Sequence, residues 1–555
     1  MAEQANLSST ERIKQASDSL RGTLKESVEN EITGNLYEDD VALVRFHGMY
    51  IQDDRDRREE RAMKKLERLY SFMIRLRLPG GVISPQQWID LHHIAGEYST
   101  GVLKITTRQT IQLHGVLKSV IKPTLKSFRE ANLTTIATCG DINRNVLCSS
   151  HPKQSALHEE IYEYAKEINR MLLPKTHAYY EIWLDDEKIA DKKSEEDPLY
   201  QDRYMPRKFK IAIAIPPNND VDVYANDLGL VAIEKNGKLL GFNISIGGGM
   251  STTHGNPDHY ARLGSVIGFV NTKEKLLKAV YEILTIQRDY GNRSDRKVAR
   301  IKYTVDRLGL DWWKEELERR TGFKLEKERP VVFEERRDYY GWEQNHQGLW
   351  YYTLYVENGR VLDTEKLLMK TALLEVAKTK KVNFIFTCNQ NVIIGDVKEE
   401  DKPLINEILE RYHLIAHTDS ASAVRRNAMA CVALNTCPLA LAESQRYFPS
   451  LLSKIELILA NHGLQNEEII MRMTGCPNGC SRPYAAEIGF VGTALGRYNL
   501  HIGGDRVGTR LNKIYKESLD EQSILSELDY LFAAFASERK EGEPFGDFAN
   551  RKYFN

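Results

Sequence analysis

Hydrophobic residues recur at helical spacing in one long segment towards the C-terminal end of the chain. Five apolar side chains would share one face of such a helix: Leu451, Leu452, Ile455, Ile458 and Leu459. Pro449 suits the first turn of this helix, and Gly463 suits its C-terminal stop. The run EEIIMRM at 467–473 then predicts a short strand, so the chain would turn back on itself here.

A pattern of turn, helix and strand occurs twice. Residues 76–116 contain a glycine turn, a helical segment and a strand, and residues 356–397 repeat this order more weakly. A second pair of similar segments occupies 241–255 and 497–510. These interleaved duplications predict a mixed α+β fold, three-lobed and pseudo-twofold, with a large cofactor between its halves.

One segment of the first repeat alternates between polar and apolar residues. Read as a single strand, residues 103–114 place six polar side chains on one face: Lys104, Thr106, Arg108, Thr110, Gln112 and His114. The second repeat lacks this cationic face, because Asn389 stands at the position of Arg108 and Ile393 at that of Gln112. The face is either a solvated sheet surface or a floor for an anionic ligand, and both interpretations stay open.

Other basic residues follow the same two-residue period. Arg75 and Arg77 precede LPGG, and Lys208 and Lys210 lie in MPRKFK. Arg144 lies in DINRNVLC. Any one of them alone would ordinarily be a surface charge. If they converge, they form a site for an oxyanion, which guanidinium and ammonium groups bind through hydrogen bonds and charge.

Composition limits the classes of function. The 555 residues suggest three or four domains, and the 42% apolar and 28% charged residues are typical of a globular protein. The net charge of −1 does not indicate a nucleic-acid partner. No apolar run approaches the roughly 18 residues of a membrane span, and the first residues lack the apolar core of a signal peptide. We therefore expect a cytoplasmic protein with reduced thiols and no membrane contact.

Four of the seven cysteines form two pairs near the C-terminal end. Five residues separate Cys431 from Cys437, and three separate Cys476 from Cys480. The helix and strand predicted between the pairs would bring them together. Four thiolates can hold zinc or an iron–sulfur cluster, and the wider spacing fits zinc poorly. The other three cysteines are expected to be core residues: Cys139, Cys148 and Cys388.

A glycine stands directly before each cysteine of the second pair. Gly475 and Gly479 would let the backbone approach a bulky inorganic core, where backbone N–H groups could donate to sulfur. These features favour a 4Fe–4S cluster. Zinc and a set of buried apolar cysteines are the alternatives.

Several motifs together carry a family resemblance. They are MACVALNTCPLALAE, MTGCPNGCSRPYAAEIGFVG, GRYNLHIGGDRVGTR, RLPGG, TTRQTIQLHG, NRNVLC, MPRKFK, GFNISIGGG and YGNRSDRKVARIKYT. From about residue 30 onward the chain resembles the sirohaem-dependent sulfite and nitrite reductase family, and within it the haemoprotein subunits of assimilatory sulfite reductases. Small departures occur at Ser481, where the family commonly has glycine, and in ALNT before Cys437.

The resemblance implies two cofactors, a 4Fe–4S cluster and sirohaem, an iron tetrapyrrole with eight carboxylates. The implied cluster ligands are Cys431, Cys437, Cys476 and Cys480. The sulfur of Cys480 would also ligate the sirohaem iron. Four basic residues match the family's substrate pocket: Arg75, Arg144, Lys208 and Lys210. The segment that carries Arg108, Gln112 and His114 would contact the tetrapyrrole.

The repeats and the resemblance together imply an order of domains. An N-terminal arm would span residues 1–72 and either wrap the body, meet a partner or present a solvated charged face. Two ferredoxin-like half-domains, 73–136 and 341–417, would pair as one central domain. The first copy of a sirohaem-binding domain would span 137–340, and the second, which carries the cluster, 418–555. Removing residues 1–60 would then weaken reduction through a partner and spare reduction by a small dye.

The implied function is the six-electron reduction of sulfite to hydrogen sulfide for cysteine biosynthesis. No G-x-G-x-x-G motif for a flavin or nicotinamide lies between a predicted strand and helix, so electrons would come from another protein. An NADPH-dependent flavoprotein subunit is the expected donor, with ferredoxin as the alternative. Nitrite reduction is the closest enzymatic alternative. A zinc- or cluster-bearing scaffold is the non-enzymatic one.

Overall fold

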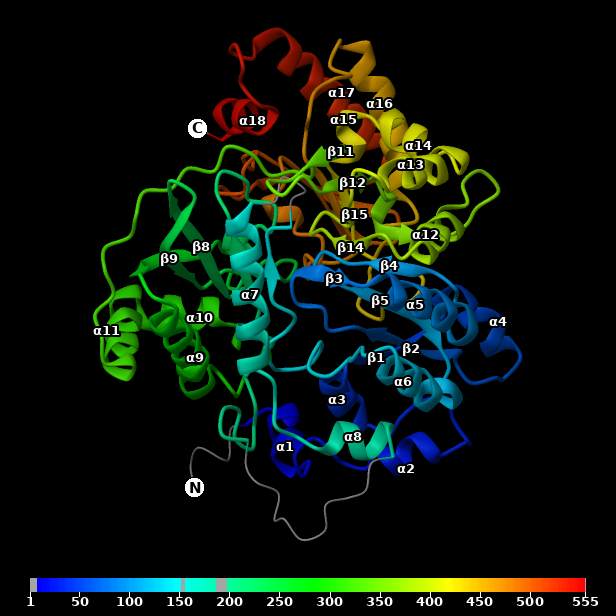
Figure 1. Cartoon of the computed structure of the whole chain (residues 1–555), viewed down its shortest axis with the longest axis vertical. Coiled ribbons are helices and arrows are strands. Elements are labelled where there is room, and N and C mark those ends of the chain that lie inside the picture. Colours follow the sequence, from blue (N-terminus) through cyan, green and yellow to red (C-terminus); the bar gives the residue numbers. More distant parts are fainter. Residues whose placement is uncertain (1–6, 151–154, 186–196, 555) are drawn as a thin grey trace.

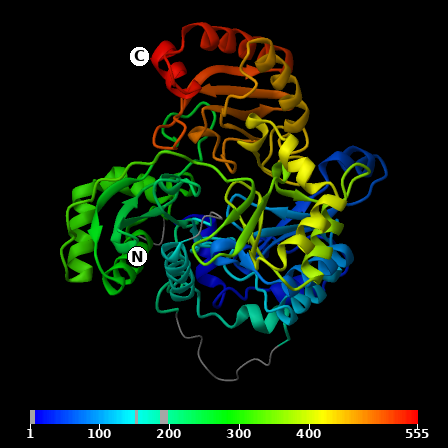
Figure 2. The same ribbon diagram turned by 45° about the horizontal axis from the view of Figure 1, so that its top comes forward.

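Four five-stranded sheets form the framework of residues 7–150, 155–185 and 197–554, the part of the chain that this computed structural model describes. They fall into two pairs, and the sheets of each pair share one strand arrangement. Figure 2 shows three lobes: a central lobe in blue and yellow, a second in green, and a third in orange and red at the C-terminal end. The expected three-lobed, duplicated α+β fold is confirmed.

The first pair of sheets forms the central lobe and is antiparallel throughout. One sheet has the order β1 (Met49–Asp53), β2 (Tyr70–Arg75), β5 (Ile111–Val116), β4 (Leu103–Ile105) and β13 (Arg360–Val361). The other has the order β11 (Gly341–Gln344), β12 (Trp350–Leu354), β15 (Val392–Val397), β14 (Asn383–Phe386) and β3 (Val82–Ile83). Each repeat lends one short strand to the other's sheet, which ties the two repeats into one unit.

The second pair of sheets belongs to the other two lobes. The first copy has the order β6 (Leu147–Cys148), β7 (Ile211–Ala214), β8 (Leu228–Lys235), β9 (Lys238–Ile246) and β10 (Ser265–Val270). The second copy has the order β16 (Ala428–Ala430), β17 (Met471–Thr474), β18 (Ile488–Ala494), β19 (Arg497–Ile502) and β20 (Lys513–Leu519). In both copies the first two pairings are parallel and the last two antiparallel, so the registers align the copies residue by residue.

Helices pack on these sheets (Figure 1). The central lobe carries α5 (Pro85–Tyr98), α6 (Ile121–Glu130), α12 (Met369–Lys378), α13 (Lys402–Arg411) and α14 (Leu414–Ser420). The second lobe carries α7 (Ala156–Met171), α9 (Lys273–Tyr290), α10 (Ile301–Leu308) and α11 (Leu310–Thr321), and α8 (Ala178–Trp183) lies near the arm. The third lobe carries α15 (Ala423–Arg426), α16 (Phe448–Asn461), α17 (Glu521–Glu538) and α18 (Phe545–Tyr553).

Capping explains the start of α5, where Ser84 and Gln87 form a reciprocal capping box around Pro85.

The helix predicted near the C-terminal end is α16. Leu451 and Ile455 are fully buried in the core of the third lobe, and Pro449 lies in the first turn, as the spacing indicated. Ile458 is only partly buried. The strand that follows is β17, which begins four residues later than the predicted run at 467, because residues 467–470 form a loop.

The alternating segment 103–114 is two strands, so its interpretation as one strand was wrong. It forms the hairpin of β4 and β5, with Lys104 paired to Gln112 and a turn over 106–110. The turn residues TTRQT include neither glycine nor proline, so the alternation continues through the turn without a break in the sequence. Gln109 takes the left-handed conformation that closes the turn, at φ 49°, as does Gln390 in the second repeat, at φ 70°.

The N-terminal arm is built into the body. It contains α1 (Ser9–Ala16), α2 (Leu24–Glu29), α3 (Asp40–Leu43) and α4 (Arg58–Met63), and its residues 49–53 form the edge strand β1. Lys14 is buried, donates to the carbonyl of Met205 at 2.8 Å and pairs with Glu11 and Asp141. The arm is therefore not a detached charged helix in the part that the structure describes.

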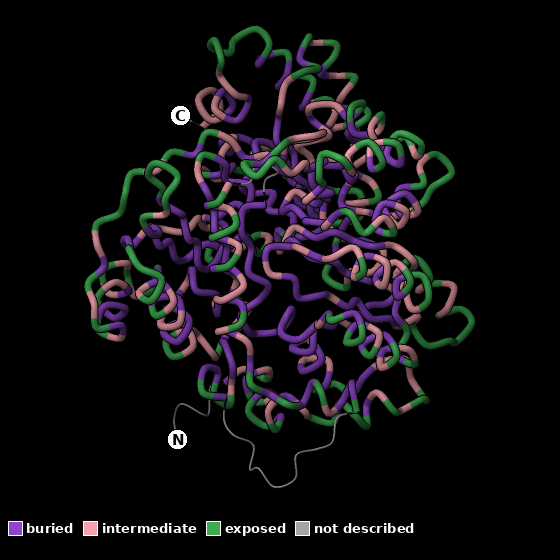
Figure 3. Tube along the Cα trace, in the orientation of Figure 1, coloured by how far each residue is buried: buried purple, intermediate pink, exposed green. Residues whose placement is uncertain are grey.

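The two largest hydrophobic cores of the described residues differ in size. One core runs from the central lobe into the first-copy sheet, and the third lobe has a core of its own. Buried backbone nevertheless continues between the lobes, as the purple interior of Figure 3 shows. Polar and ionic contacts supply much of this junction, and the predicted site residues lie there.

Candidate cofactor and anion site

The four paired cysteines gather at one edge of the third lobe's sheet. Cys431 follows β16 and Cys476 follows β17, and these strands are parallel neighbours whose carboxyl ends meet. Burial and the charges of neighbouring cysteines raise the pKa values of Cys437 and Cys476 to about 12. Four thiols this close therefore need a positively charged metal group to ionise together.

Hydrogen-bond donors point at two of these sulfurs. The backbone N–H of Gly475 lies 3.3 Å from Cys431 Sγ, and Thr474 Oγ1 lies 3.5 Å from the same sulfur. Asn478 Nδ2 lies 3.5 Å from Cys476 Sγ. Such donors stabilise thiolates and tune sulfur-ligated clusters. Among the described residues, no group of three or more histidine, cysteine or acidic side chains could hold a single metal ion.

A cluster of cations lies beside Cys480. Asn143 pairs with Phe209, so Arg144, Lys208 and Lys210 flank this pair on neighbouring extended segments. Burial and the charges of Arg207 and Arg300 lower the pKa of Lys208 to about 7, while Cys480 acts in the opposite direction. Burial and Lys208 together lower the pKa of Lys210 well below its ordinary value. Neither ammonium group has a hydrogen bond or ion pair to any residue in the described ranges.

Arg75 reaches this cluster from the end of β2. The side-chain oxygen of Gln112 accepts from its Nη2 and Nε at 2.5 and 2.8 Å, once the amide is oriented to satisfy both groups. The amide nitrogen of Gln112 then donates to His114 Nε2 at 3.2 Å, and His114 Nδ1 donates to Gln52 at 2.9 Å. Burial and the charge of Lys104 lower the pKa of His114 to about 3, so His114 is neutral near pH 7.

Arg108 lies at the hairpin turn and is held by the first copy. Its Nη1 donates to Asn226 at 3.1 Å, its Nη2 donates to the Asn145 carbonyl, and its Nε is buried without a partner among the described residues. Burial lowers its pKa to about 9. Arg108, Arg144, Lys208 and Lys210 thus act on one another's charge at one junction, where Cys480 also acts on Lys208.

Two further cations in this cluster were not predicted. Arg300 forms two hydrogen bonds to Asp227, at 2.9 and 2.7 Å, and both residues are buried. Lys302 donates to the carbonyl of Ser251 at 2.6 Å, and burial and Arg300 lower its pKa to about 7. Both cations lie in the motif YGNRSDRKVARIKYT, which supported the resemblance and received no role.

One carboxylate joins the two copies beneath this site. Asp222 precedes η6 (Val223–Ala225) and Arg482 precedes η9 (Pro483–Ala485), both with left-handed backbone, so the two residues are equivalent by the duplication. They form an ion pair with each other. Arg472 and Arg336 also bind this carboxylate, at 2.7 and 2.8 Å.

Arg482 lies near the pseudo-twofold axis. Its Nη1 and Nη2 donate to the carbonyls of Thr107 and Cys388, each at 3.0 Å, and these two residues occupy the same position in the two hairpin turns. Thr107 Oγ1 in turn donates to the carbonyl of Cys480 at 3.2 Å. The loop that carries Cys480 is therefore held by both repeats.

The first copy lacks the paired cysteines. The strand registers place Ser149 at the position of Cys431, and the left-handed residues place Asp220 at that of Cys480. Ser149 Oγ donates to Asp220 at 2.6 Å, and burial raises the pKa of Asp220 to about 7. The equivalent site is closed by this hydrogen bond, so the duplication leaves one thiol-lined site.

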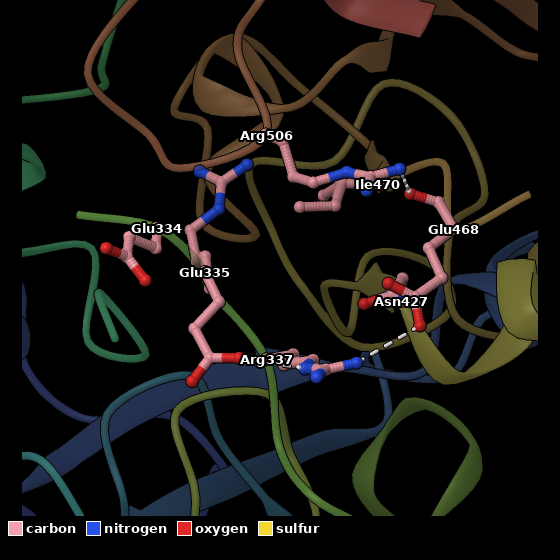
Figure 4. Close-up of a pocket in the computed structure, with 8 residues that line it drawn as sticks. Glu334, Glu335, Arg337, Asn427, Glu468, Ile470 and Arg506 are labelled. Carbon is pink, nitrogen blue, oxygen red and sulfur yellow. Dashed lines mark hydrogen bonds and ion pairs between the residues drawn. The ribbon is translucent and has the colours of Figure 1, made fainter. Parts of the chain in front are cut away.

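A separate cavity of about 170 Å³ is lined by Arg336 and by Glu335, Arg337, Glu468 and Arg506, among others (Figure 4). Arg337 pairs with Glu335 and Glu468 there, each at 3.2 Å, and Arg506 donates to the backbone carbonyl of Glu468. The cavity contains none of the predicted site residues. The ammonium groups of Lys208 and Lys210, which have no ion pair among the described residues, lie in the junction near Cys480 and do not line this cavity.

Known proteins match this chain along nearly its whole length. Residues 163–325 match the nitrite and sulphite reductase 4Fe-4S domain, and residues 65–131 and 343–412 match the nitrite/sulfite reductase ferredoxin-like half domain. The chain is 59% identical to the sulfite reductase (NADPH) hemoprotein beta-component of Leptospira biflexa, over 99% of both proteins. The chain belongs to the nitrite and sulfite reductase family. The protein of the same name from Anoxybacillus flavithermus is 53% identical to this reductase, over 98% of this chain and 95% of the other.

A solved structure supports the fold of the reductase. The NirA protein of Mycobacterium tuberculosis matches it with a TM-score of 0.79 at 24% identity, over 98% of this chain and 96% of that one. The matched 4Fe-4S segment, 163–325, contains no cysteine and lies in the first copy. The duplicated sheet explains this, since the cysteines lie at equivalent positions of the second copy. No helix of the described reductase is long and apolar enough to span a membrane.

The residues present fit an iron–sulfur cluster beside an anionic tetrapyrrole. Two of the four sulfurs receive N–H or O–H donors. Among the described residues, no ion pair to a carboxylate is formed by Arg75, Arg108, Arg144, Lys208, Lys210 or Lys302, whereas Arg300 pairs with Asp227. The Gly475 N–H donates to sulfur as predicted, and both glycines also allow close packing. A Cβ on Gly475 would lie 2.5 Å from Ala433 Cβ, and one on Gly479 would lie 2.7 Å from the Met250 carbonyl, so both allow close packing of protein segments.

Proposed function

We propose that this reductase is the haemoprotein component of an assimilatory sulfite reductase, which converts sulfite to hydrogen sulfide with six electrons from a partner protein. One observation carries the proposal. Four cysteines lie close together, and cations without ion pairs among the described residues lie beside one of them, Cys480. The names of the relatives, which are 59% and 53% identical, supply the substrate and the NADPH-dependent complex.

The cysteines would hold the cofactors. Cys431, Cys437, Cys476 and Cys480 would ligate the 4Fe–4S cluster, and Cys480 would also ligate the iron of sirohaem. When bound, these groups supply the electron transfer and the reduction itself. Arg108, Gln112 and His114 would lie against the tetrapyrrole, and the cations of the junction would neutralise its eight carboxylates.

The substrate would meet four basic side chains of this chain. Arg75 and Arg144 would bind sulfite oxygens through guanidinium N–H groups. Lys208 would hold a proton close to these oxygens, and with a pKa of about 7 it can donate and regain a proton near neutral pH. Lys210 would add charge beside it. The protein would thus position the dianion, compensate its charge and deliver protons as water leaves.

The electron donor would be an NADPH-dependent flavoprotein subunit. The relatives named as beta-components imply a further subunit, and no dinucleotide-binding motif was found in this sequence. A ferredoxin is the alternative donor, and nitrite is the alternative substrate. We place the complex in the cytoplasm, where its thiols would stay reduced.

The test is the stoichiometry of the reaction with a small reduced dye as the electron source. We expect one sulfide for each six electrons consumed with sulfite, and higher kcat/KM for sulfite than for nitrite. Ammonium production at higher kcat/KM would instead identify a nitrite reductase. Absence of both products from protein loaded with iron and sirohaem would contradict an enzymatic role.

A further inference from the structure

The turn Thr138–Gly140 anchors both arginines that we assign to the substrate. The carbonyl of Thr138 accepts from Arg75 Nη1 at 3.3 Å and from Arg144 Nη1 at 3.1 Å. The carbonyl of Gly140 accepts from Arg144 Nε and Nη2 at 3.0 and 2.8 Å. Two like charges are thereby held side by side although they repel each other.

Cys139 supplies the side chain of this turn. It is fully buried, and its Sγ lies 3.2 Å from Arg75 Nη1. The sequence suggested only a core residue at this position, but the sulfur accepts from a cation rather than packing only against apolar groups.

These contacts leave each arginine with little freedom. A guanidinium has five N–H groups. In Arg75 the Nε and one Nη2 hydrogen go to Gln112, and the Nη1 pair goes to Thr138 and Cys139. In Arg144 the Nη2 pair goes to Gly140 and Tyr50, the latter at 3.3 Å. One N–H of each guanidinium thus has no acceptor among the described residues.

We infer that Cys139 is a positioning residue, which orients the Arg75 guanidinium so that its free N–H faces the substrate oxyanion. The inference rests on the proposed function, because it needs Arg75 to bind the substrate. Without the sulfur, one Nη1 hydrogen loses its acceptor and Arg75 can rotate towards the solvent of the pocket. Fewer of the guanidinium orientations would then fit the oxyanion.

The experiment measures KM and kcat for sulfite with holoenzyme and a reduced dye. Cys139→Ala removes the acceptor and should raise KM about three- to tenfold, the range of one lost hydrogen bond, with kcat within about twofold. Cys139→Ser keeps an acceptor and should lie between the wild type and Cys139→Ala. Cys148→Ser is the matched control, since it changes another fully buried thiol and should leave KM unchanged. If Cys139→Ala loses cofactor or melts early, Cys139→Val fills the space without an acceptor and should show the same KM.

Arg75→Lys, measured in parallel, separates the claim that Arg75 binds the substrate from the claim that Cys139 orients Arg75. A raised KM in Arg75→Lys with an unchanged KM in Cys139→Ala and Cys139→Val would overturn the role of Cys139 and leave the substrate pocket intact. An unchanged KM in Arg75→Lys would remove Arg75 from the pocket and overturn both. An equal KM rise in Cys139→Ser and Cys139→Ala would show that volume, and not the acceptor, matters, which also overturns the inference.

Discussion

The charge of Lys208 depends on what the pocket contains. Without an anion, burial and the neighbouring cations Arg207 and Arg300 lower its pKa to about 7. An oxyanion favours the ammonium form and raises this pKa. Binding therefore takes up a proton at pH values above 7, and affinity falls as the pH rises.

We predict that the sulfite KM of the wild type rises about tenfold more between pH 6.5 and 8.5 than that of Lys208→Arg. Arginine stays charged over this range, so the variant lacks the proton uptake of residue 208. The measurement is KM against pH with a dye donor. Ionisation of sulfite itself affects both proteins equally and cancels in the comparison. Parallel pH profiles for the two proteins would remove Lys208 from substrate binding.

The sequence could identify individual site residues only where a motif marked them. The two cysteine pairs and the lysines of MPRKFK are of this kind. Arg75 and Arg77 show the limit, because only Arg75 enters the cation cluster. Arg77 is buried and donates to Asn169 at 2.8 Å and to the Ala137 carbonyl at 3.0 Å. Two arginines separated by one residue look alike in the sequence. Their spacing does not show which guanidinium donates to backbone carbonyls and which one faces a ligand.

At the scale of elements, the loop between β17 and β18 depends on contacts from outside its own lobe. Asp222 of the first copy binds Arg482 and Arg472, and Arg336 completes the set. All four side chains are buried. No sequence motif could reveal this cluster of ion pairs around Asp222, which we call the Asp222 hub, because positions 222 and 482 meet only when the two copies fold against each other.

We predict that Asp222→Asn lowers the free energy of unfolding by about 3–5 kcal/mol, because three buried guanidinium groups then share no anion. Urea unfolding followed by circular dichroism measures this loss. Asp306→Asn is the control, since Asp306 pairs with Arg262 at the surface, where such pairs contribute at most about 1 kcal/mol. Equal losses in the two variants would show that the hub is not needed for stability.

The arm and the hairpin show where patterns along the chain mislead. Removing residues 1–60 would delete β1 and Gln52, together with the buried Lys14. We now expect that deletion to reduce activity with a dye as well as with a partner, so it cannot isolate a docking role. The hairpin was misread as one strand because its turn carries no residue that marks a turn.

At the scale of the whole molecule, the sequence showed the duplication, but it showed only some of the differences between the two copies. The repeats predicted two matching halves, and the four sheets confirm this arrangement. The exchange of β3 and β13 between the repeats was not foreseeable, because strands of two residues carry no periodic signal. Likewise the closed site of Ser149 and Asp220 follows only from the strand register.

The central claim is that Cys480 connects a 4Fe–4S cluster to a sirohaem, and the visible absorption spectrum tests it most directly. We would record it for the wild type, Cys480→Ser and Cys148→Ser, each expressed with added iron and sirohaem, with and without sulfite under reduction. We expect a chlorin-type band that shifts with sulfite in the wild type and in Cys148→Ser, and loss of both the band and the cluster's iron in Cys480→Ser. A colourless wild type that holds zinc, or an unchanged spectrum in Cys480→Ser, would contradict the account.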